Sequence, residues 1–411
     1  MGKRIYALAA ALGVALAVLV GVSAGAGGTP GVTSKLISIG GTAPLSGPAS
    51  AYGTIPQAEA AYFSYFNSLK QPGGKRGVYG RQIQFTYLDD GYNPAQTVQL
   101  TRQLVEQSKV FAIFNSVGTE TNEAIRAYLN QAKVPQVLLA TGASEWGVLA
   151  KKYPWTIGYQ PTYASEAGAY GQFIVKKVPQ AKIGVLYQND SYGKDYIAGL
   201  KKGLGAKQSQ IVDMEGYEVT APDVGSQIAK LKASGANTLC IFATPKFAIQ
   251  AFAIAAKLGW NPIVFNNSVS ATPTLMTIAT ASSSAATTNG TITATYTKDP
   301  TDAKWANDAG MKLYKKIMAA YYPKGNVNDQ FNVYGMSAAW TMIRALQGAG
   351  QNPTRASLMA SLRSMNYSDN PFLLPGIKVQ TSASNPFPII QQQLTRWTDG
   401  HYVNFGPLIK S

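Results

Sequence analysis

Short apolar runs alternate regularly with longer amphipathic segments in the first third of this 411-residue sequence. The apolar runs have the length of β-strands and cover residues 36–43, 82–88, 110–115 and 134–140. Helical patterns lie between them, at about residues 51–69, 94–108 and 119–132. Continuous apolar strands separated by helices are typical of βαβ units, in which helices cover both faces of a parallel sheet. The pattern therefore predicts an α/β fold.

The same alternation starts again beyond residue 180. Strand-like runs cover residues 182–187, 211–217, 238–243 and 263–265, and helical patterns cover 192–204, 223–234 and 246–258. Because a chain of this length is too long for one core, we expect two Rossmann-like lobes, each with a parallel central sheet. Residues 156–161 form a natural crossover between them.

The last third has a different pattern. It predicts a strand at 292–296, helices at 302–321, 328–347 and 354–365, and a hairpin of residues 391–397 and 401–405. These elements are too few for a third domain, so we expect them to complete the two lobes. The Ser-, Thr- and Ala-rich stretch 277–289 is expected to be a surface loop.

Residues 1–26 have the pattern of a secretory signal peptide. Lys3 and Arg4 precede an apolar run at 5–22, and an Ala-Gly-Ala cleavage sequence follows at 24–26. No Cys follows the run, so the usual site of a bacterial lipid anchor is missing. We expect an exported protein, periplasmic or extracytoplasmic and without a lipid anchor. An uncleaved membrane anchor is the alternative, since the run is just long enough to span a bilayer.

Composition argues against several classes of function. The formal net charge of +16 arises from few acids (20) rather than many bases, and no Lys/Arg run interleaved with aromatic residues occurs, so we expect no nucleic-acid partner. The only histidine is His401 and the only cysteine is Cys240, which excludes metal sites with several histidines and an intramolecular disulfide. His401 lies in a predicted hairpin turn and is expected to face solvent, which argues against a Ser-His-Asp triad or a Cys-His pair. The Asp89-Asp90 pair is better suited to capping a loop than to catalysis, because adjacent strand residues point to opposite faces. We therefore expect a binding protein, not an enzyme, with no metal and no cofactor.

Three strand ends carry the features of a small-molecule site. Residues 43–53 form a Pro-, Ser- and Gly-rich loop after the first strand, and such loops border the ligand crevice of open α/β sheets. Gly118-Thr119 and Ala140-Thr141-Gly142 end two further strands, and a helix start there would offer N–H groups and a hydroxyl to an anion. Aromatic residues recur at the predicted rims, and they would give the cleft apolar walls: Tyr52, Trp146, Tyr159, Tyr163, Tyr192 and Tyr334.

Four segments together resemble the solute-binding proteins of ABC importers in the branched-chain amino acid (Leu/Ile/Val-binding) family, which have the type I periplasmic-binding-protein fold. The segments are APLSGP (43–48) with Tyr52-Gly53, YLDDGYNPAQTV (87–98), VPQVLLATGAS (134–144) and YQNDSYGKDY (187–196). The resemblance runs from Leu36 to about Pro407. It implies a ligand cleft between two lobes, residues 34–159 with 292–387 and residues 160–291 with 388–411. Three crossovers, near Tyr159, Ile292 and Pro388, would let the lobes close by hinge motion.

The resemblance also implies roles for individual residues. Thr119, Thr141 and neighbouring N–H groups would hold a ligand carboxylate, with Tyr52 beside it. Tyr192 would close from the second lobe. The expected ligand-binding residues are Tyr52, Gly118, Thr119, Ala140, Thr141, Gly142, Tyr163, Glu166, Tyr192, Thr244, Ser268 and Tyr334. The implied partners are a small carboxylate-bearing solute and an ABC permease with its ATPase, and the protein is expected to be a monomer.

Two ligand classes stay open at this point. Tyr163 and Ser268 fall near positions where amino-acid-binding relatives place acids that hold the ligand's ammonium, and neither is acidic. If Glu166 substitutes, the ligand is a branched-chain or other hydrophobic amino acid; otherwise it is an aromatic or other non-amino organic acid. Two rivals remain: an exported carboxylate-dependent hydrolase with acids such as Asp90 and Glu166 facing each other across the cleft, and a ligand-sensing module, which should carry an output domain.

Overall fold

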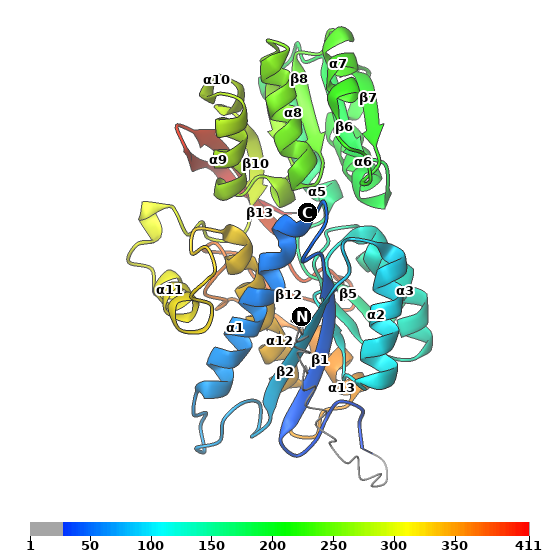
Figure 1. Cartoon of the computed structure of the whole chain (residues 1–411), viewed down its shortest axis with the longest axis vertical. Coiled ribbons are helices and arrows are strands. Elements are labelled where there is room, and N and C mark those ends of the chain that lie inside the picture. The colour runs from blue at the N-terminus through cyan, green and yellow to red at the C-terminus, as the bar shows by residue number, and fades with distance from the viewer. Residues whose placement is uncertain (1–27, 411) are drawn as a thin grey trace, which may run out of the picture.

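The computed structural model describes residues 28–410, and the predicted signal peptide lies outside the described residues. Figure 1 shows two lobes, one above the other, each a sheet flanked by helices. This arrangement confirms the predicted α/β fold with two lobes.

Lobe 1 is built on a five-stranded parallel sheet in the order β2-β1-β3-β4-β5. Its strands are β1 (Leu36–Ala43), β2 (Gln82–Asp89), β3 (Ile113–Phe114), β4 (Gln136–Leu139) and β5 (Thr156–Gly158). Successive strands are connected by α1 (Thr54–Ser68), α2 (Pro94–Arg102), α3 (Thr119–Gln131) and α4 (Glu145–Val148). The chain returns later to add α11 (Ala309–Tyr321), α12 (Gln330–Gly348), α13 (Arg355–Leu362) and a ribbon of β11 (Asn366–Tyr367) and β12 (Val379–Gln380).

Lobe 2 contains a seven-stranded sheet in the order β14-β13-β10-β9-β8-β6-β7. Its strands are β6 (Ile183–Gln188), β7 (Ile211–Tyr217), β8 (Thr238–Phe242), β9 (Ile263–Asn266), β10 (Ile292–Thr295), β13 (Gln391–Thr398) and β14 (His401–Lys410). The pairs from β7 to β10 are parallel, whereas β10–β13 and β13–β14 are antiparallel. The helices are α5 (Tyr163–Lys177), α6 (Ser191–Leu204), α7 (Gly225–Ala233), α8 (Pro245–Lys257), α9 (Pro273–Ser282) and α10 (Ala285–Thr288).

Two expectations need correction. The stretch 277–289 is not a loop, because α9 and α10 cover most of it. Its hydroxyls are accommodated within the helix: those of Thr277 and Thr280 donate to the carbonyls four residues earlier. The lobe boundary at residue 292 is also wrong by one strand, since Ile292 pairs with Phe265 in the lobe 2 sheet and the chain crosses only after β10.

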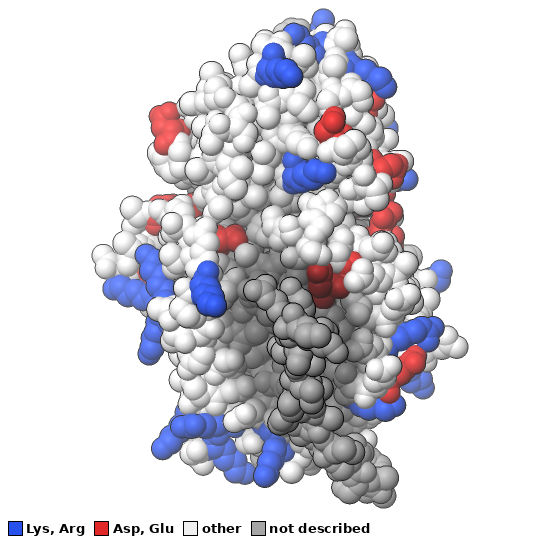
Figure 2. Space-filling model, viewed as in Figure 1, with Lys and Arg blue, Asp and Glu red and all other residues white. Residues whose placement is uncertain are grey.

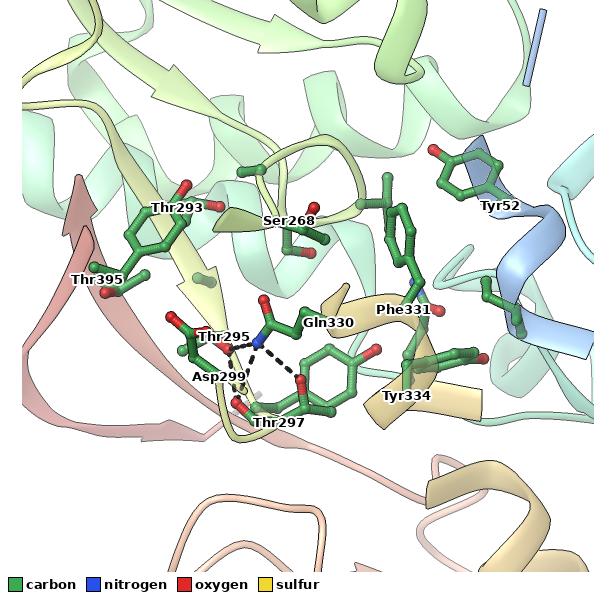
Figure 3. Close-up of a pocket in the computed structure, with 18 of the residues that line it drawn as sticks. Tyr52, Ser268, Thr293, Thr295, Thr297, Asp299, Gln330, Phe331, Tyr334 and Thr395 are labelled. Carbon is green, nitrogen blue, oxygen red and sulfur yellow. Dashed lines mark hydrogen bonds between the residues drawn. The ribbon is translucent and has the colours of Figure 1, made fainter. Parts of the chain in front are cut away.

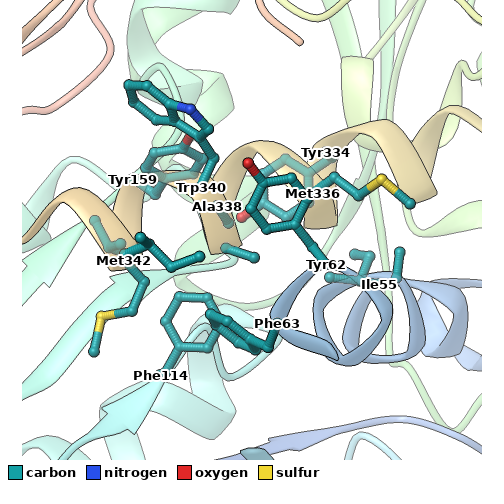
Figure 4. Packing of buried hydrophobic residues seen from close by; sticks show 14 of the residues in the cluster. Ile55, Tyr62, Phe63, Phe114, Tyr159, Tyr334, Met336, Ala338, Trp340 and Met342 are labelled. Atoms are coloured by element: carbon teal, nitrogen blue, oxygen red, sulfur yellow. The ribbon is translucent and has the colours of Figure 1, made fainter. Parts of the chain in front are cut away.

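The core of lobe 1 lies between the sheet, α1 and α12 (Figure 4). Gly335 lets these helices approach closely, because a Cβ there would lie 2.6 Å from the carbonyl oxygen of Ile55. On the sheet side, the ring of Phe63 meets that of Phe114 edge-on at 5.5 Å. The packing holds the start of α12 at the edge of the interlobe space.

Asp329 ties the starts of α1 and α12 together. One carboxylate oxygen accepts the Phe331 N–H at 3.0 Å, which caps α12, and the other accepts the Thr54 hydroxyl at 2.9 Å. The first residues of α12 therefore stand beside Tyr52, whose ring meets that of Phe331 at 5.2 Å. These residues enter the site described next.

The surface charge is dispersed. On the face shown in Figure 2, Lys and Arg side chains lie in several separate places on both lobes, with Asp and Glu between them. That face therefore presents no single basic patch.

Candidate ligand-binding cleft

A cleft between the lobes brings together eight of the twelve expected site residues. Tyr52, Gly118, Ala140 and Tyr334 line it from lobe 1, and Tyr163, Tyr192, Thr244 and Ser268 line it from lobe 2. About 80 Å³ is open there to the centres of water molecules. The cleft is therefore large enough to hold more than one water molecule. It suits a compact organic ligand.

The loop that carries Tyr52 is held by Asp89 at the end of β2. One Asp89 oxygen accepts the N–H groups of Leu45, Ser46 and Gly91 at 2.9, 3.2 and 3.0 Å. Burial alone would raise the pKa of Asp89, but hydrogen bonding to the Ser46 side chain together with these N–H bonds outweighs it, and the pKa lies below its ordinary value. The neighbouring Asp90 accepts the Thr97 hydroxyl at 2.8 Å and does not line the cleft. The pair thus caps its loop, as its position in the sequence indicated.

Thr119 and Thr141 meet at the start of α3, with their hydroxyl oxygens 2.7 Å apart. Neither lines the cleft, and nor does Gly142, because Tyr163 lies in front of them. A Cβ atom added to Gly142 would lie 2.9 Å from two atoms of the Tyr163 ring. Burial raises the pKa of Tyr163 to about 12, an effect opposed by hydrogen bonding to Thr141, Gly142 and Thr119. The hydroxyl pair thus faces a phenol of the protein itself.

Glu166 does not line the cleft either. Its side chain is buried (3% exposed) and bonds to Ser268, which does line the cleft. Its two oxygens accept the hydroxyls of Tyr170 (2.6 Å) and Tyr196 (3.1 Å) and the N–H (2.7 Å) and hydroxyl (2.6 Å) of Ser268. Burial raises the pKa of Glu166, and the bonds from Ser268 and Tyr170 oppose the rise. Four donors saturate this carboxylate, so it fixes Ser268 in place.

Tyr192 is the expected residue with a free hydrogen-bonding group. Its side chain is 2% exposed, lines the cleft and has no hydrogen-bond partner for its hydroxyl among the described residues. The ring meets that of Tyr163 edge-on at 5.1 Å, and Tyr163 stacks on Tyr196 at 4.6 Å. This aromatic stack fixes the direction of the Tyr192 hydroxyl.

Further lining residues were not expected from the sequence. Many are aromatic or hydroxyl-bearing. They come from the loop before α2, the segment after β5, β10 and the segment that follows it, the start of α12, and strands β13 and β14: Tyr92, Gln160, Thr293, Thr295, Tyr296, Thr297, Asp299, Trp305, Gln330, Phe331, Thr395, Tyr402 and Asn404. Figure 3 shows Gln330 bonded to Thr295 and Thr297, which lie between Tyr52 and Thr395. The alternation of Thr in residues 291–297 was the available signal, since it marks one strand face as polar.

Hydrogen bonds across the cleft hold the lobes together. The N–H and the hydroxyl of Ser144 in lobe 1 both donate to one oxygen of Asp195 on α6, each at 3.0 Å. Nearby, the pKa of Glu123 is raised to about 8 by burial and by the adjacent Glu145, and Ser191 at the start of α6 opposes the rise. The start of α6 is therefore docked on lobe 1.

Two sheets joined by three chain crossings, with a polar and aromatic cleft between them, define a two-lobed binding protein. The chain belongs to the periplasmic binding protein family, whose model matches residues 36–401. It is similar to the leucine-, isoleucine-, valine-, threonine- and alanine-binding protein of Pseudomonas aeruginosa, at 24% identity over 207 residues, 50% of this chain and 52% of that protein. The chain spans about half the length of the curated relatives that it matches first.

Solved structures support the same fold. One is a branched-chain amino acid ABC transporter protein from Thermus thermophilus with bound valine (TM-score 0.80, 17% identity, 92% of this chain and 98% of that one). Another is a solute-binding protein from R. palustris in complex with 4-hydroxybenzoate (TM-score 0.72, 18% identity, 92% and 97%). At these identities the likeness establishes the fold and leaves the ligand open.

The described residues were also compared with the requirements of a membrane-spanning helix and of a metal site. No helix within residues 28–410 has the length and apolar character needed to cross a membrane. Over the same residues, no three His, Cys, Asp or Glu side chains gather where they could hold a metal ion.

Proposed function

We propose that this protein is the extracytoplasmic receptor of an ABC importer and that it captures a small non-amino organic acid with an aromatic or hydrophobic body. The lobes close over the acid by hinge motion, and the closed form is presented to the permease and its ATPase. Binding is the whole of its role; no chemical step is involved. Its family and the two-lobed cleft support the receptor role.

The saturation of Glu166 carries the choice of ligand class. An ammonium group buried near Ser268 would need a carboxylate partner, because an unpaired buried charge is costly. Glu166 already accepts four hydrogen bonds, so its lone pairs are engaged by the protein. This part of the cleft therefore favours a ligand without an amino group.

The remaining groups suit an acid of this kind. The rings of Tyr52, Tyr163, Tyr192, Phe331 and Tyr334 wall the cleft and would cover an apolar body. The unpartnered Tyr192 hydroxyl can donate to the carboxylate, and α3 begins directly after Gly118, which places the positive end of the helix dipole at the same wall. Hydrogen bonds to a charged group contribute about 1.5–3 kcal/mol each, so a few can offset desolvation of a carboxylate.

A hydrophobic amino acid is the second candidate. Asp299 lines the far end of the cleft, and one of its oxygens has no hydrogen-bond partner within residues 28–410, so it offers an acceptor to an ammonium group. The names of the curated relatives point to the same class.

Calorimetry with matched ligand pairs separates the two candidates. Each pair differs only by the amino group: 3-phenylpropanoate against phenylalanine, and 4-methylpentanoate against leucine. We expect the acid without the amino group to bind about 100-fold or more tightly, because it leaves no ammonium buried without a partner. Tighter binding of phenylalanine and leucine would overturn the proposed ligand class.

Two variants test the part played by Tyr192. Tyr192→Phe removes only the hydroxyl and should weaken binding of 3-phenylpropanoate about tenfold or more, which corresponds to one hydrogen bond to a charged group. Tyr187→Phe, in the same lobe but outside the cleft, serves as the control. Equal affinities for the two variants would contradict the assigned role of Tyr192.

A further inference from the structure

One face of three neighbouring strands lines the cleft on the side away from Tyr52 (Figure 3). In the antiparallel register Thr293 of β10 stands opposite Thr395 of β13, and Thr395 stands opposite Asn404 of β14. Directly opposite residues share a sheet face, with Cβ atoms about 4.5–5.5 Å apart. Thr293, Thr395 and Asn404 therefore form a continuous polar row, called here the Thr row.

Two hydroxyls on this face have no partner among the described residues. Thr395 is 1% exposed and Tyr402 is 8% exposed, and both line the cleft. Tyr402 shares the face of the Thr row because it pairs with Trp397, two residues beyond Thr395. A buried hydroxyl without a hydrogen bond is costly, so ligand atoms are the natural partners.

The segment that follows β10 adds two more unpartnered groups to the same compartment. Asp299 uses one oxygen to accept the N–H and hydroxyl of Thr301, at 2.8 and 2.7 Å, and its other oxygen accepts no hydrogen bond from the part of the chain that the structure describes. The indole N–H of Trp305 is also buried and unpartnered, and both residues line the cleft. Burial and then the charge of Asp299 raise the pKa of Tyr402, as expected for a carboxylate near that hydroxyl.

The charges of the compartment select among ligand groups. Lys304 and Asp302 also line the cleft and pair with each other at 2.6 Å, and Lys298 pairs with Asp308 at 2.7 Å, so each nearby ammonium already balances a carboxylate other than Asp299. A ligand anion would meet Asp299 without a free cation to balance it. An ammonium could bond Asp299 but could not accept the Trp305 N–H, whereas a hydroxyl both donates and accepts.

We propose that the compartment formed by the Thr row, Tyr402, Asp299 and Trp305 binds an uncharged, hydroxyl-bearing end of the ligand. This inference rests on the proposed function, in which the acid end lies at Tyr192. It narrows the ligand class to organic acids that carry a hydroxyl at the end opposite the carboxylate.

Two acids that differ by one hydroxyl test the compartment. Calorimetry compares 3-(4-hydroxyphenyl)propanoate with 3-phenylpropanoate for the wild-type protein and for Thr395→Val and Tyr402→Phe. Thr398→Val is the matched control, because Thr398 lies on the same strand, on the opposite face and outside the cleft. Melting curves confirm that each variant is folded.

The readout is the ratio of the two affinities. We expect the wild-type protein and Thr398→Val to prefer the hydroxylated acid about five- to tenfold or more, and Thr395→Val and Tyr402→Phe to lose most of that preference. Equal wild-type affinities, or a preference that both cleft variants keep, would overturn the compartment and leave the receptor for organic acids standing. A wild-type protein that binds neither acid would refute the proposed function, and the hydroxyl-bearing ligand class would fall with it.

Discussion

Glu59 on α1 makes the stability of lobe 1 depend on pH. The side chain is 0% exposed, and neither carboxylate oxygen has a hydrogen-bond partner among the described residues. Burial raises the pKa of Glu59 well above its ordinary value. The folded protein therefore keeps a proton on Glu59 at pH values where the unfolded chain, with a glutamate pKa of about 4.3, has released it.

The size of the effect follows from proton linkage. One proton bound only in the folded state lowers the free energy of unfolding by about 1.4 kcal/mol for each pH unit above the unfolded pKa, until the folded pKa is reached. The stabilisation is thus complete at acid pH and is lost as the pH rises. Glu59→Gln is isosteric and cannot titrate. Between pH 5 and pH 7 its free energy of unfolding should rise relative to that of the wild-type protein, up to the limit of about 2.7 kcal/mol that one proton sets over two pH units.

Urea unfolding followed by circular dichroism at pH 5, 6 and 7 measures this gain. Other buried acids cancel, because only the difference between variant and wild type is used. Glu218→Gln is the control, since it replaces an exposed glutamate of lobe 2 by the same amide and leaves Glu59 in place. A Glu59→Gln difference that does not change between pH 5 and pH 7 would show that Glu59 is ionised in the folded protein and would refute the reasoning.

Three further substitutions follow from single contacts. Asp195→Asn should raise the Kd for 3-phenylpropanoate about tenfold, because Asp195 accepts two charge-assisted hydrogen bonds from Ser144 of the other lobe. An unchanged affinity in calorimetry would show that these two bonds do not hold the closed form. Gly335→Ala should lower the free energy of unfolding by about 1–3 kcal/mol, since the new Cβ would stand 2.6 Å from the Ile55 carbonyl oxygen; a wild-type melting temperature would contradict this. Glu166→Gln should lower the free energy of unfolding by about 1–3 kcal/mol, because its amide NH₂ group would face groups that donate hydrogen bonds to the wild-type carboxylate. A free energy of unfolding equal to that of the wild-type protein would mean that these donors reorient.

The alternation of strands and helices was sufficient to predict the two sheets, because in βαβ units neighbouring segments of the chain become neighbours in space. The same local pattern could not reveal the Thr row. Thr293 meets Thr395 only through the pairing of β10 with β13, which lies about a hundred residues further along the chain. A local pattern shows which face of a strand is polar, but not which distant strand completes it.

Composition misled the prediction where hydroxyls have two possible uses. The stretch 277–289 has the Ser and Thr content of a loop, yet Thr272 caps α9 by accepting the Leu275 N–H, and Pro273 occupies the first turn. The hydroxyls of Thr277 and Thr280 then bond back to the helix itself. The start signal at residues 272–273 was visible in the sequence and outweighs the composition.

The predicted site differs from the observed cleft mainly at Tyr163. Its position was expected, but the direction of its ring depends on the docking of α5 and α6 and on the stack with Tyr192 and Tyr196. Because the ring covers Thr119 and Thr141, a ligand cannot reach that hydroxyl pair in this conformation and must use donors further along the cleft. Among the described residues, the unpartnered donors and acceptors that line the cleft lie at Tyr192, on β13 and β14, and in the segment after β10, and the proposed acid and hydroxyl ends are placed there. One aromatic side chain at the start of α5 thus covers the predicted carboxylate site, and for this reason we place the acid end of the ligand at Tyr192 and its hydroxyl end at the Thr row.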